Sequence, residues 1–246
     1  MKKQILIVFA VAIAMQDVMA SSATKDDVRF FQHFQRDAAQ SSVVYVEGSG
    51  SYAKYDDSDL SATAFVVQGG IPLAANIEVG LGGGFVRVKP ENGSSESGLA
   101  DIEIVGKYHV RDQGNNRVTV GASLTLPIGD EDIGQGDTDI GFFGAIRHPV
   151  DNKTVVMGMA GLNFEEQGDD DRETSFQLGG GVIYQVDRQL HLSGELGLHT
   201  EGDRMALTAG ADYQTQGRGR LRGAVLLGLD DGSPDLMLQA GYLVRF

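Results

Sequence analysis

Charged and titratable side chains recur at alternate positions in segments that are otherwise apolar. An extended chain places alternate residues on opposite faces, so these side chains share one polar face. Polar groups gathered on one face can pair with each other, or they can line a path that sorts solutes by charge. The candidates for this polar, lumen-lining face are Glu47, Glu78, Asp101, Glu103, Lys107, His109, Asp139, Arg147, His191, Glu195, Asp212, Arg220 and Arg222.

A second group of candidates lies between the extended segments, in acidic stretches such as "GDEDIG" and "GDDDR". Clustered carboxylate oxygens are the ligands that Ca²⁺ and Mg²⁺ prefer. Neither stretch has the full spacing of an EF-hand loop, and a solvated acidic surface is the alternative interpretation. The metal-ligand candidates are Asp130, Asp132, Asp169, Asp170 and Asp171. No other cofactor is expected.

Catalysis is not expected from these residues. A lipid hydrolase built on a membrane-facing sheet needs its serine and histidine on the face that meets lipid. Here His191, Ser193 and His199 lie on the polar face, and no nucleophile motif surrounds Ser193. The absence of Cys excludes disulfides, zinc–thiolate sites and thiol catalysis. A net charge of −14 argues against nucleic-acid binding, which needs a basic face.

The elements that position these residues are predicted to be about twelve strands. Segments of this length, apolar on one face and polar on the other, are typical of a transmembrane antiparallel up-and-down β-barrel of the bacterial outer membrane. The sheet must close, because lipid satisfies no unpaired strand edge. We therefore predict an all-β fold. The strands are expected near residues 42–54, 60–70, 75–88, 99–110, 117–128, 138–148, 153–164, 173–185, 190–200, 204–214, 219–229 and 235–246.

The connections between these segments separate by charge. Counted alternately, one set is long and acidic, and the other is short and basic. Alternate loops of an up-and-down barrel emerge at the same end, so the charge separates into an acidic rim and a basic rim. Such barrels have their longer loops outside the cell. The acidic rim is therefore expected outside, and both chain termini are expected on the periplasmic side.

The chain is predicted to have three parts. Residues 1–20 have a positive start, a short apolar run and small residues near the end, the pattern of a cleaved signal peptide. Residues 42–246 form the barrel. Residues 21–41 form a periplasmic N-terminal segment in which Val28, Phe31 and Phe34 indicate a short amphipathic helix. Three interpretations stay open for this segment: a plug in the lumen, an interfacial helix, or a loosely ordered tail.

Short motifs between residues 98 and 139 carry a family resemblance. The stretches "GLADIEIVGKYHV", "ASLTLPIGD" and "GQGDTDIGFFGAIRH" resemble the outer-membrane barrel family named for the MetA pathway of phenol degradation. That family repeats G-L-G-D, L-P-x-G-D and G-x-G-x-T-D, and Ala100 stands where it usually has Gly. The matches are Gly98, Leu99, Asp101, Leu126, Pro127, Gly129, Asp130, Gly134, Gly136, Thr138 and Asp139. The resemblance is good over residues 99–164. It implies a barrel that takes up small aromatic compounds, whereas the inward charges favour polar solutes.

The chain ends on the strand "SPDLMLQAGYLVRF". Its Tyr242, Val244 and Phe246 resemble the signal by which the barrel assembly machinery selects outer-membrane proteins. The expected location is therefore the outer membrane of a Gram-negative bacterium. The expected partners are membrane lipid, this machinery and small solutes.

The predicted function is a channel or passive transporter for small solutes. One alternative is a structural or surface-interaction barrel with an occluded lumen. A weaker alternative is an acidic outer rim that binds divalent cations.

Overall fold

The computed structural model describes residues 27–55, 59–113, 116–130, 133–134, 136–167, 171–215 and 217–246. The predicted signal peptide lies outside these residues. The strands are β1 (Tyr45–Tyr55), β2 (Leu60–Ala74), β3 (Ile77–Pro90), β4 (Glu96–Leu99), β5 (Ile102–Gln113), β6 (Asn116–Leu126), β7 (Ile140–Pro149), β8 (Thr154–Gln167), β9 (Asp171–Gln185), β10 (Leu190–His199), β11 (Arg204–Gln214), β12 (Gly219–Gly228) and β13 (Leu236–Arg245). A 3₁₀ turn, η2 (Glu201–Asp203), joins β10 to β11.

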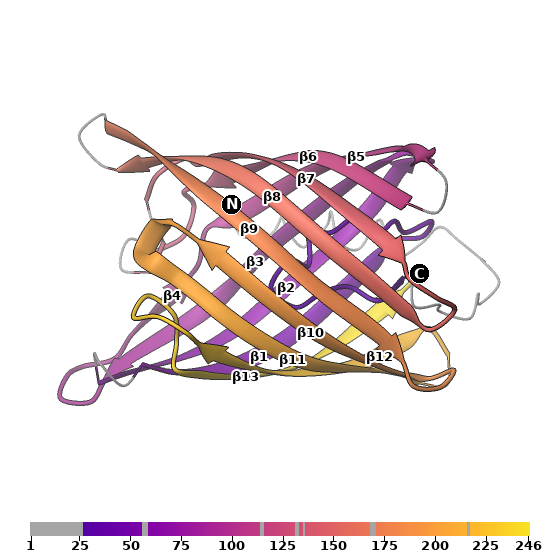
Figure 1. The fold of residues 1–246 in the computed structure, drawn as a ribbon. Coiled ribbons are helices and arrows are strands. Elements are labelled where there is room, and N and C mark those ends of the chain that lie inside the picture. The colour runs from indigo at the N-terminus through magenta and orange to yellow at the C-terminus, as the bar shows by residue number, and fades with distance from the viewer. Residues whose placement is uncertain are drawn as a thin grey trace.

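These strands form one closed antiparallel barrel (Figure 1). The barrel closes where β1 pairs with both β2 and β13, the last strand of the chain. Both β4 and β5 pair with β3, at its two ends, so together they fill one place in the wall. The wall therefore has twelve places, which confirms the predicted closed barrel and the predicted strand number.

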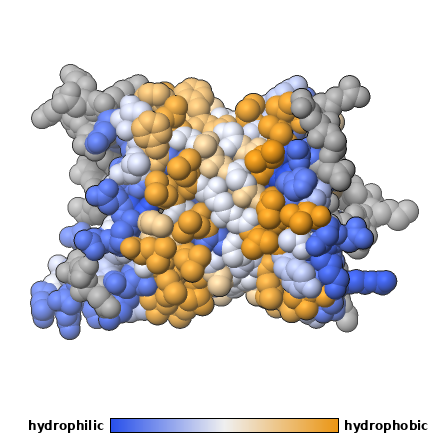
Figure 2. All heavy atoms as spheres, in the orientation of Figure 1, coloured by the Kyte–Doolittle hydropathy of each residue, from blue (hydrophilic) through white to orange (hydrophobic). Residues whose placement is uncertain are grey.

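Side chains alternate between the two faces of the wall. In β7, Phe142 is 54% exposed on the outer face, whereas its neighbour Phe143 is 6% exposed inside. Figure 2 shows hydrophobic residues in two belts with paler residues between them, and hydrophilic residues at both ends. This is the surface that a barrel needs in order to sit in a bilayer. Among the described residues, no helix has the length and apolar character needed to cross a membrane.

Residues 27–44, which we call the luminal segment, lie inside the ring of strands before β1 (Figure 1). The predicted amphipathic helix is not present, because the described part of the segment contains no α-helix. The physical reason is that wall side chains bond its backbone. Glu195 accepts hydrogen bonds from the backbone N–H groups of Phe31 and Gln32, at 2.7 and 2.9 Å. Arg147 donates to the carbonyl of Val28 at 2.6 Å.

The strand predicted at 99–110 is interrupted at Ala100 and Asp101. At the interruption, the motif residues contact each other. The Leu99 N–H donates to Asp130 Oδ2 at 2.7 Å, and the Asp130 N–H donates to the Leu99 carbonyl at 2.9 Å. The Gly129 N–H donates to Asp101 Oδ1 at 2.9 Å. Two of the motifs therefore fasten the end of β6 to the break in the neighbouring strand.

Candidate functional site

The luminal segment is held by ion pairs to the wall, and Glu78 of β3 is the centre of one group. The Arg29 guanidinium of the segment lies 3.2 Å from Glu78, and Lys107 Nζ of β5 lies 2.6 Å from it. The Tyr45 hydroxyl donates to the same carboxylate at 2.6 Å. Arg29 also stacks on the Tyr45 ring, 3.9 Å from its centroid. A buried carboxylate needs this number of partners to offset the cost of leaving water.

A second buried pair joins Asp37 of the luminal segment to Arg147 of β7. Arg147 Nε donates to Asp37 Oδ1 at 2.6 Å, and a second guanidinium nitrogen contacts Asp37 Oδ2. Both side chains are almost completely buried. The contact is bidentate, which is the strong geometry for an arginine and a carboxylate.

Arg222 of β12 contacts the segment from the opposite part of the wall. Its guanidinium contacts Glu47 of β1 and the backbone carbonyl of Arg29, and it lies 3.2 Å from Asp212 of β11. The same guanidinium stacks on the Phe31 ring, 4.3 Å from the centroid. Charged wall residues therefore contact the backbone and the aromatic rings of the segment as well as its charged side chains.

Apolar side chains of the segment pack on an apolar part of the inner wall. Val28, Phe30 and Ala38 form one buried cluster with residues of β5, β7, β8 and β9. The wall residues of this cluster are Val105, Phe143, Ala145, Met157, Met159 and Ile183. A second buried cluster contains Phe34, Tyr45 and Leu243. The segment is thus anchored by apolar burial as well as by charge.

Wall glycines make room for the segment. A Cβ atom at Gly179 would collide with the His33 ring, and one at Gly181 would collide with the Phe30 ring and with backbone. A Cβ atom at Gly197 would collide with Gln32, and one at Gly80 would collide with Gln35. A Cβ atom at Gly210 would collide with Phe31 and Ser193. The wall is therefore hollowed opposite individual side chains of the luminal segment.

The shifted pKa values of Asp37 and His33 determine their charges in the segment at neutral pH. Burial raises the pKa of the Asp37 carboxyl. The Arg147 guanidinium and its hydrogen bonds to the carboxyl more than offset this, so the pKa lies below its ordinary value. Burial lowers the pKa of His33 to about 4, with Asp37 opposing the shift and Arg36 adding to it. At neutral pH the segment therefore holds an ionised Asp37 and a neutral His33.

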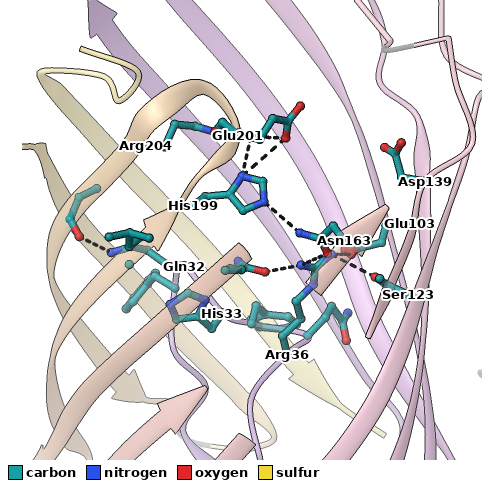
Figure 3. Close-up of a pocket in the computed structure, with 18 of the residues that line it drawn as sticks. Gln32, His33, Arg36, Glu103, Ser123, Asp139, Asn163, His199, Glu201 and Arg204 are labelled. Carbon is teal, nitrogen blue, oxygen red and sulfur yellow. Dashed lines mark hydrogen bonds and ion pairs between the residues drawn. The ribbon is translucent and has the colours of Figure 1, made fainter. Parts of the chain in front are cut away.

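Beyond the segment, towards the acidic loops, the lumen opens into a polar cavity of about 460 Å³, which we call the vestibule (Figure 3). Residues 31–36 form its floor, and residues of β5 to β12 line its walls. Arg36 rises from the floor and lies 2.8 Å from Glu103, 3.1 Å from the Ser123 hydroxyl and 3.2 Å from Asn163 Oδ1.

A second cavity of about 510 Å³ lies where the chain enters the barrel. It is lined by residues 40–44 of the luminal segment, by residues 72–75 at the β2–β3 turn, and by Asp27 and Arg117. The vestibule is lined by residues 31–36 and this second cavity by residues 40–44, so the segment stands between the two.

The structure places most predicted lumen residues in the buried interior. Glu47, Glu78, Lys107, His109, Arg147, His191, Glu195, Asp212, Arg220 and Arg222 are buried. Glu103 and Asp139 line the vestibule. Asp101 lies at the strand break and accepts from Gly129. Of the metal candidates, Asp130 accepts from Leu99, and Asp132, Asp169 and Asp170 lie outside the described residues. Asp171 begins β9.

Sequence reasoning allowed a plug in the lumen but did not identify the residues with which it pairs to the wall. Arg29, Arg36 and Asp37 were not among the candidates, although each pairs with a wall residue of the predicted polar face. One usable signal was present: two arginines and an aspartate flank an aromatic-rich run that precedes the first strand. The predicted polar face holds more carboxylates than lysines and arginines, so it lacks cations unless the arginines of this run lie inside.

Comparison with known proteins places the fold. No family model matches the chain, and no curated protein sequence matches it. Among solved structures, the COG4313 outer membrane channel from Pseudomonas putida F1 aligns with a TM-score of 0.66 at 13% identity, over 86% of this chain and 98% of that one.

Two porins give similar alignments. The KdgM porin in complex with disordered oligogalacturonate has a TM-score of 0.60 at 12% identity, over 82% of this chain and 99% of its own. The NanC porin has a TM-score of 0.60 at 11% identity, over 82% of this chain and 100% of its own. The chain therefore has the fold of outer-membrane channel and porin barrels.

Proposed function

We propose that the protein is an outer-membrane barrel for the passage of small polar solutes, and that the luminal segment is the plug that closes it. The observation that carries this proposal is that the segment stands between two cavities of about 460 and 510 Å³. In the docked arrangement the plug fills the lumen between them. Passage then requires the plug to move or to leave.

The conductance of the purified protein in planar bilayers tests this proposal. We compare the wild type with a variant that lacks residues 27–40. The expected result is few or no channel events for the wild type and clear open steps for the variant. If neither protein gives channel events, while both migrate as folded barrels, the channel function is wrong.

The alternative function is a structural or surface-interaction barrel with a permanently occluded lumen. The buried ion pairs Arg29–Glu78 and Arg147–Asp37 favour it, because they hold the plug in place. An ion pair between two wall residues, Asp212 of β11 and Arg220 of β12, favours it as well. A wild-type protein that stays closed under all voltages, and through which no solute enters proteoliposomes, supports this alternative.

The vestibule indicates the class of solute. Its carboxylates are Glu103, Asp139, Glu165 and Glu201, and its guanidinium groups are Arg36 and Arg204. Because acids exceed bases, we propose neutral or cationic polar solutes. An anionic oligosaccharide such as the oligogalacturonate bound by the KdgM porin fits this vestibule poorly. Liposome swelling with neutral, cationic and anionic sugars of equal size distinguishes the classes.

We also propose the finer family resemblance, in which the chain belongs with the MetA-pathway barrels. Its support is that Leu99 and Asp101 of the first motif bond Asp130 and Gly129 of the second. Uptake of aromatic compounds, which the resemblance implies, is a competing substrate class. It predicts that phenol, rather than a neutral sugar, enters vesicles that hold the unplugged barrel.

Membrane insertion and orientation complete the proposal. We place the acidic loops outside the cell and the luminal segment on the periplasmic side of an outer membrane. Tyr242 faces outward on β13, and the Phe246 N–H donates to the Val44 carbonyl at 2.9 Å. If Tyr242, Val244 and Phe246 are the assembly signal, deletion of Phe246 should reduce insertion by the assembly machinery. Normal insertion of that variant contradicts this role.

A further inference from the structure

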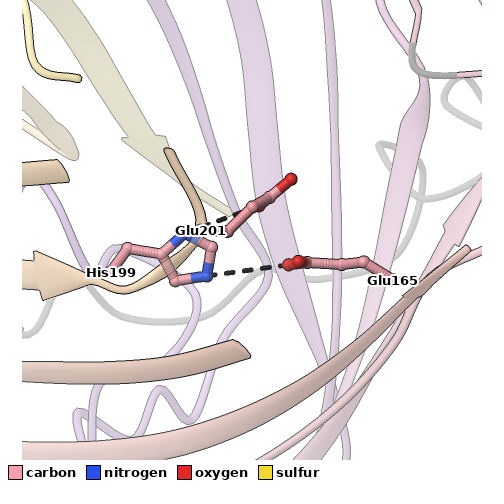
Figure 4. Close-up of side chains that lie close together, drawn as sticks. All are labelled: Glu165, His199 and Glu201. Atoms are coloured by element: carbon pink, nitrogen blue, oxygen red, sulfur yellow. Dashed lines mark ion pairs between the residues drawn. The ribbon is translucent and has the colours of Figure 1, made fainter. Parts of the chain in front are cut away.

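Three side chains with metal-binding atoms converge at the rim of the vestibule: Glu165 of β8, His199 of β10 and Glu201 of η2 (Figure 4). One ligand atom from each lies within 4.8 Å of the other two. Glu165 Oε1 is 3.7 Å from His199 Nε2, and Glu201 Oε2 is 3.6 Å from His199 Nδ1. Ligands of a tetrahedral ion with bonds of about 2.1 Å stand roughly 3.4 Å apart. The two carboxylates approach different nitrogens of the His199 ring, so side-chain rotation must bring both of them to the same nitrogen before they share one ion.

The Glu165 carboxylate supplies an independent observation. Its side chain is 9% exposed, yet its Oε2 has no hydrogen-bond donor among the described residues. Its other oxygen accepts from the Ser175 hydroxyl at 3.0 Å. A buried carboxylate oxygen without a donor is costly. Because the Glu201 carboxylate converges on the same place, two carboxylates meet beside one exposed guanidinium, that of Arg204, and a further cation would balance their charge.

Neighbouring side chains hold the imidazole in position. Asn163 Nδ2 lies 2.9 Å and Ser175 Oγ 3.2 Å from His199 Nε2. On the other side of the ring, an Arg204 nitrogen lies 2.9 Å from Nδ1 and 2.9 Å from Glu201. Arg204 is 48% exposed, so its side chain can swing into solvent. The Arg204 guanidinium therefore occupies part of the space that a bound metal ion would take, and the side chain can move out of it.

We propose that Glu165, His199 and Glu201 bind a first-row divalent transition metal ion of the Zn²⁺ class, with water as the remaining ligand. An imidazole with two carboxylates suits Zn²⁺, whereas Ca²⁺ and Mg²⁺ prefer oxygen ligands alone. These residues differ from the acidic-loop candidates of the sequence, and none of those loops supplies a histidine. The inference does not depend on solutes crossing the barrel.

Isothermal titration of ZnCl₂ into the purified full-length protein in detergent tests the site. We expect one Zn²⁺ for the wild type, and binding weakened by on the order of 10–100-fold in Glu165→Gln, His199→Gln and Glu201→Gln. Matched controls are His148→Gln, which removes an exposed histidine elsewhere, and Glu96→Gln, which removes an acid of β4. Both should bind like the wild type. Arg204→Gln should bind more tightly, because a competing cation is gone.

Several outcomes overturn the proposal. They are no Zn²⁺ binding by the wild type, equal affinities in the wild type and the three ligand variants, or weaker binding in Arg204→Gln. Binding of CaCl₂ as tight as that of ZnCl₂ also overturns it, since it indicates a general acidic surface. Heat-modifiable migration on gels shows for each variant that the barrel is folded. Glu201 lies in the turn η2 outside the strands, so its variant tests the site even if Glu165→Gln fails to fold.

Discussion

The middle of the barrel and the vestibule are enclosed by the same strands, but they hold the luminal segment in different ways. In the middle, the Arg29–Glu78 pair is 3% and 1% exposed. At the vestibule floor, the Arg36–Glu103 pair is 20% and 33% exposed. Both are arginine–glutamate pairs between the segment and the wall. The difference in exposure determines how much free energy is lost when each pair is broken.

A buried pair is expensive to break, because the remaining charge stays in a medium without water. An exposed pair is replaced by water at little cost. The luminal segment is therefore bound strongly to the wall in the middle of the barrel and weakly at the vestibule.

Asp37→Asn should give the largest effect. It leaves the Arg147 guanidinium buried without its carboxylate, so docking of the luminal segment should weaken by about 3–5 kcal/mol. Trypsin cleavage at Arg29 and Arg36 measures this, because a docked segment is protected inside the wall.

The double variant Asp37→Asn/Arg147→Gln is the control for Asp37→Asn. It removes both charges and should recover part of the protection. If Asp37→Asn resists trypsin as the wild type does, the segment is not bound strongly in the middle of the barrel.

Gly179→Leu should give the next largest effect. Its side chain would occupy the space of the His33 ring, and overpacking of this kind costs about 1–3 kcal/mol. The variant should therefore expose the segment to trypsin and raise the conductance. Gly180→Leu is the matched control, since the adjacent Cβ meets only ordinary contacts. Equal behaviour of the two variants would mean that the glycine hollows do not hold the segment.

A change of pH should act through His33. Its pKa is about 4 when docked and ordinary when released, so the released segment binds more protons between these values. Docking should therefore be fully stable above pH 6.5 and should weaken as the pH falls from about 6.5 towards 4. Asp37 stays ionised through this window. In His33→Gln the trypsin protection should lose this pH dependence; an unchanged dependence would assign it to another group.

Glu103→Gln should give the smallest effect on docking, about 0–1 kcal/mol, because its pair with Arg36 is partly in water. It should still lower the preference of the unplugged barrel for cations, since a vestibule carboxylate is lost. Reversal potentials in a KCl gradient measure that preference. A loss of trypsin protection as large as that of Asp37→Asn would remove the contrast between the two regions.

The barrel could be predicted from the sequence because its signals are local. Strict alternation, as in "RVTVGASLTLP", determines the two faces of a strand, and β6 follows it. The closing pairing of β1 with β13 follows from the need to leave no edge in lipid. Burial of Glu78, Lys107 and Arg147 on one face is a consequence of the same alternation.

The contacts of the luminal segment could not be predicted, because they join residues far apart in the chain. The pair between Asp37 and Arg147 and the fit of Phe30 against Gly181 have no periodicity that a sequence displays. The helix expected for the luminal segment was wrong for the same reason. Its helical spacing is a local signal, but carboxylates and guanidinium groups of distant strands bond its backbone.

The contacts of the luminal segment also join the beginning of the chain to its end. The segment precedes β1 and touches the strands made last: Phe34 packs with Leu243 of β13, and Arg222 of β12 contacts the Arg29 carbonyl. The last two strands therefore complete contacts that hold the segment in the lumen. The same β13 closes the wall by pairing with β1. Closure of the barrel and docking of the segment thus depend on shared strands.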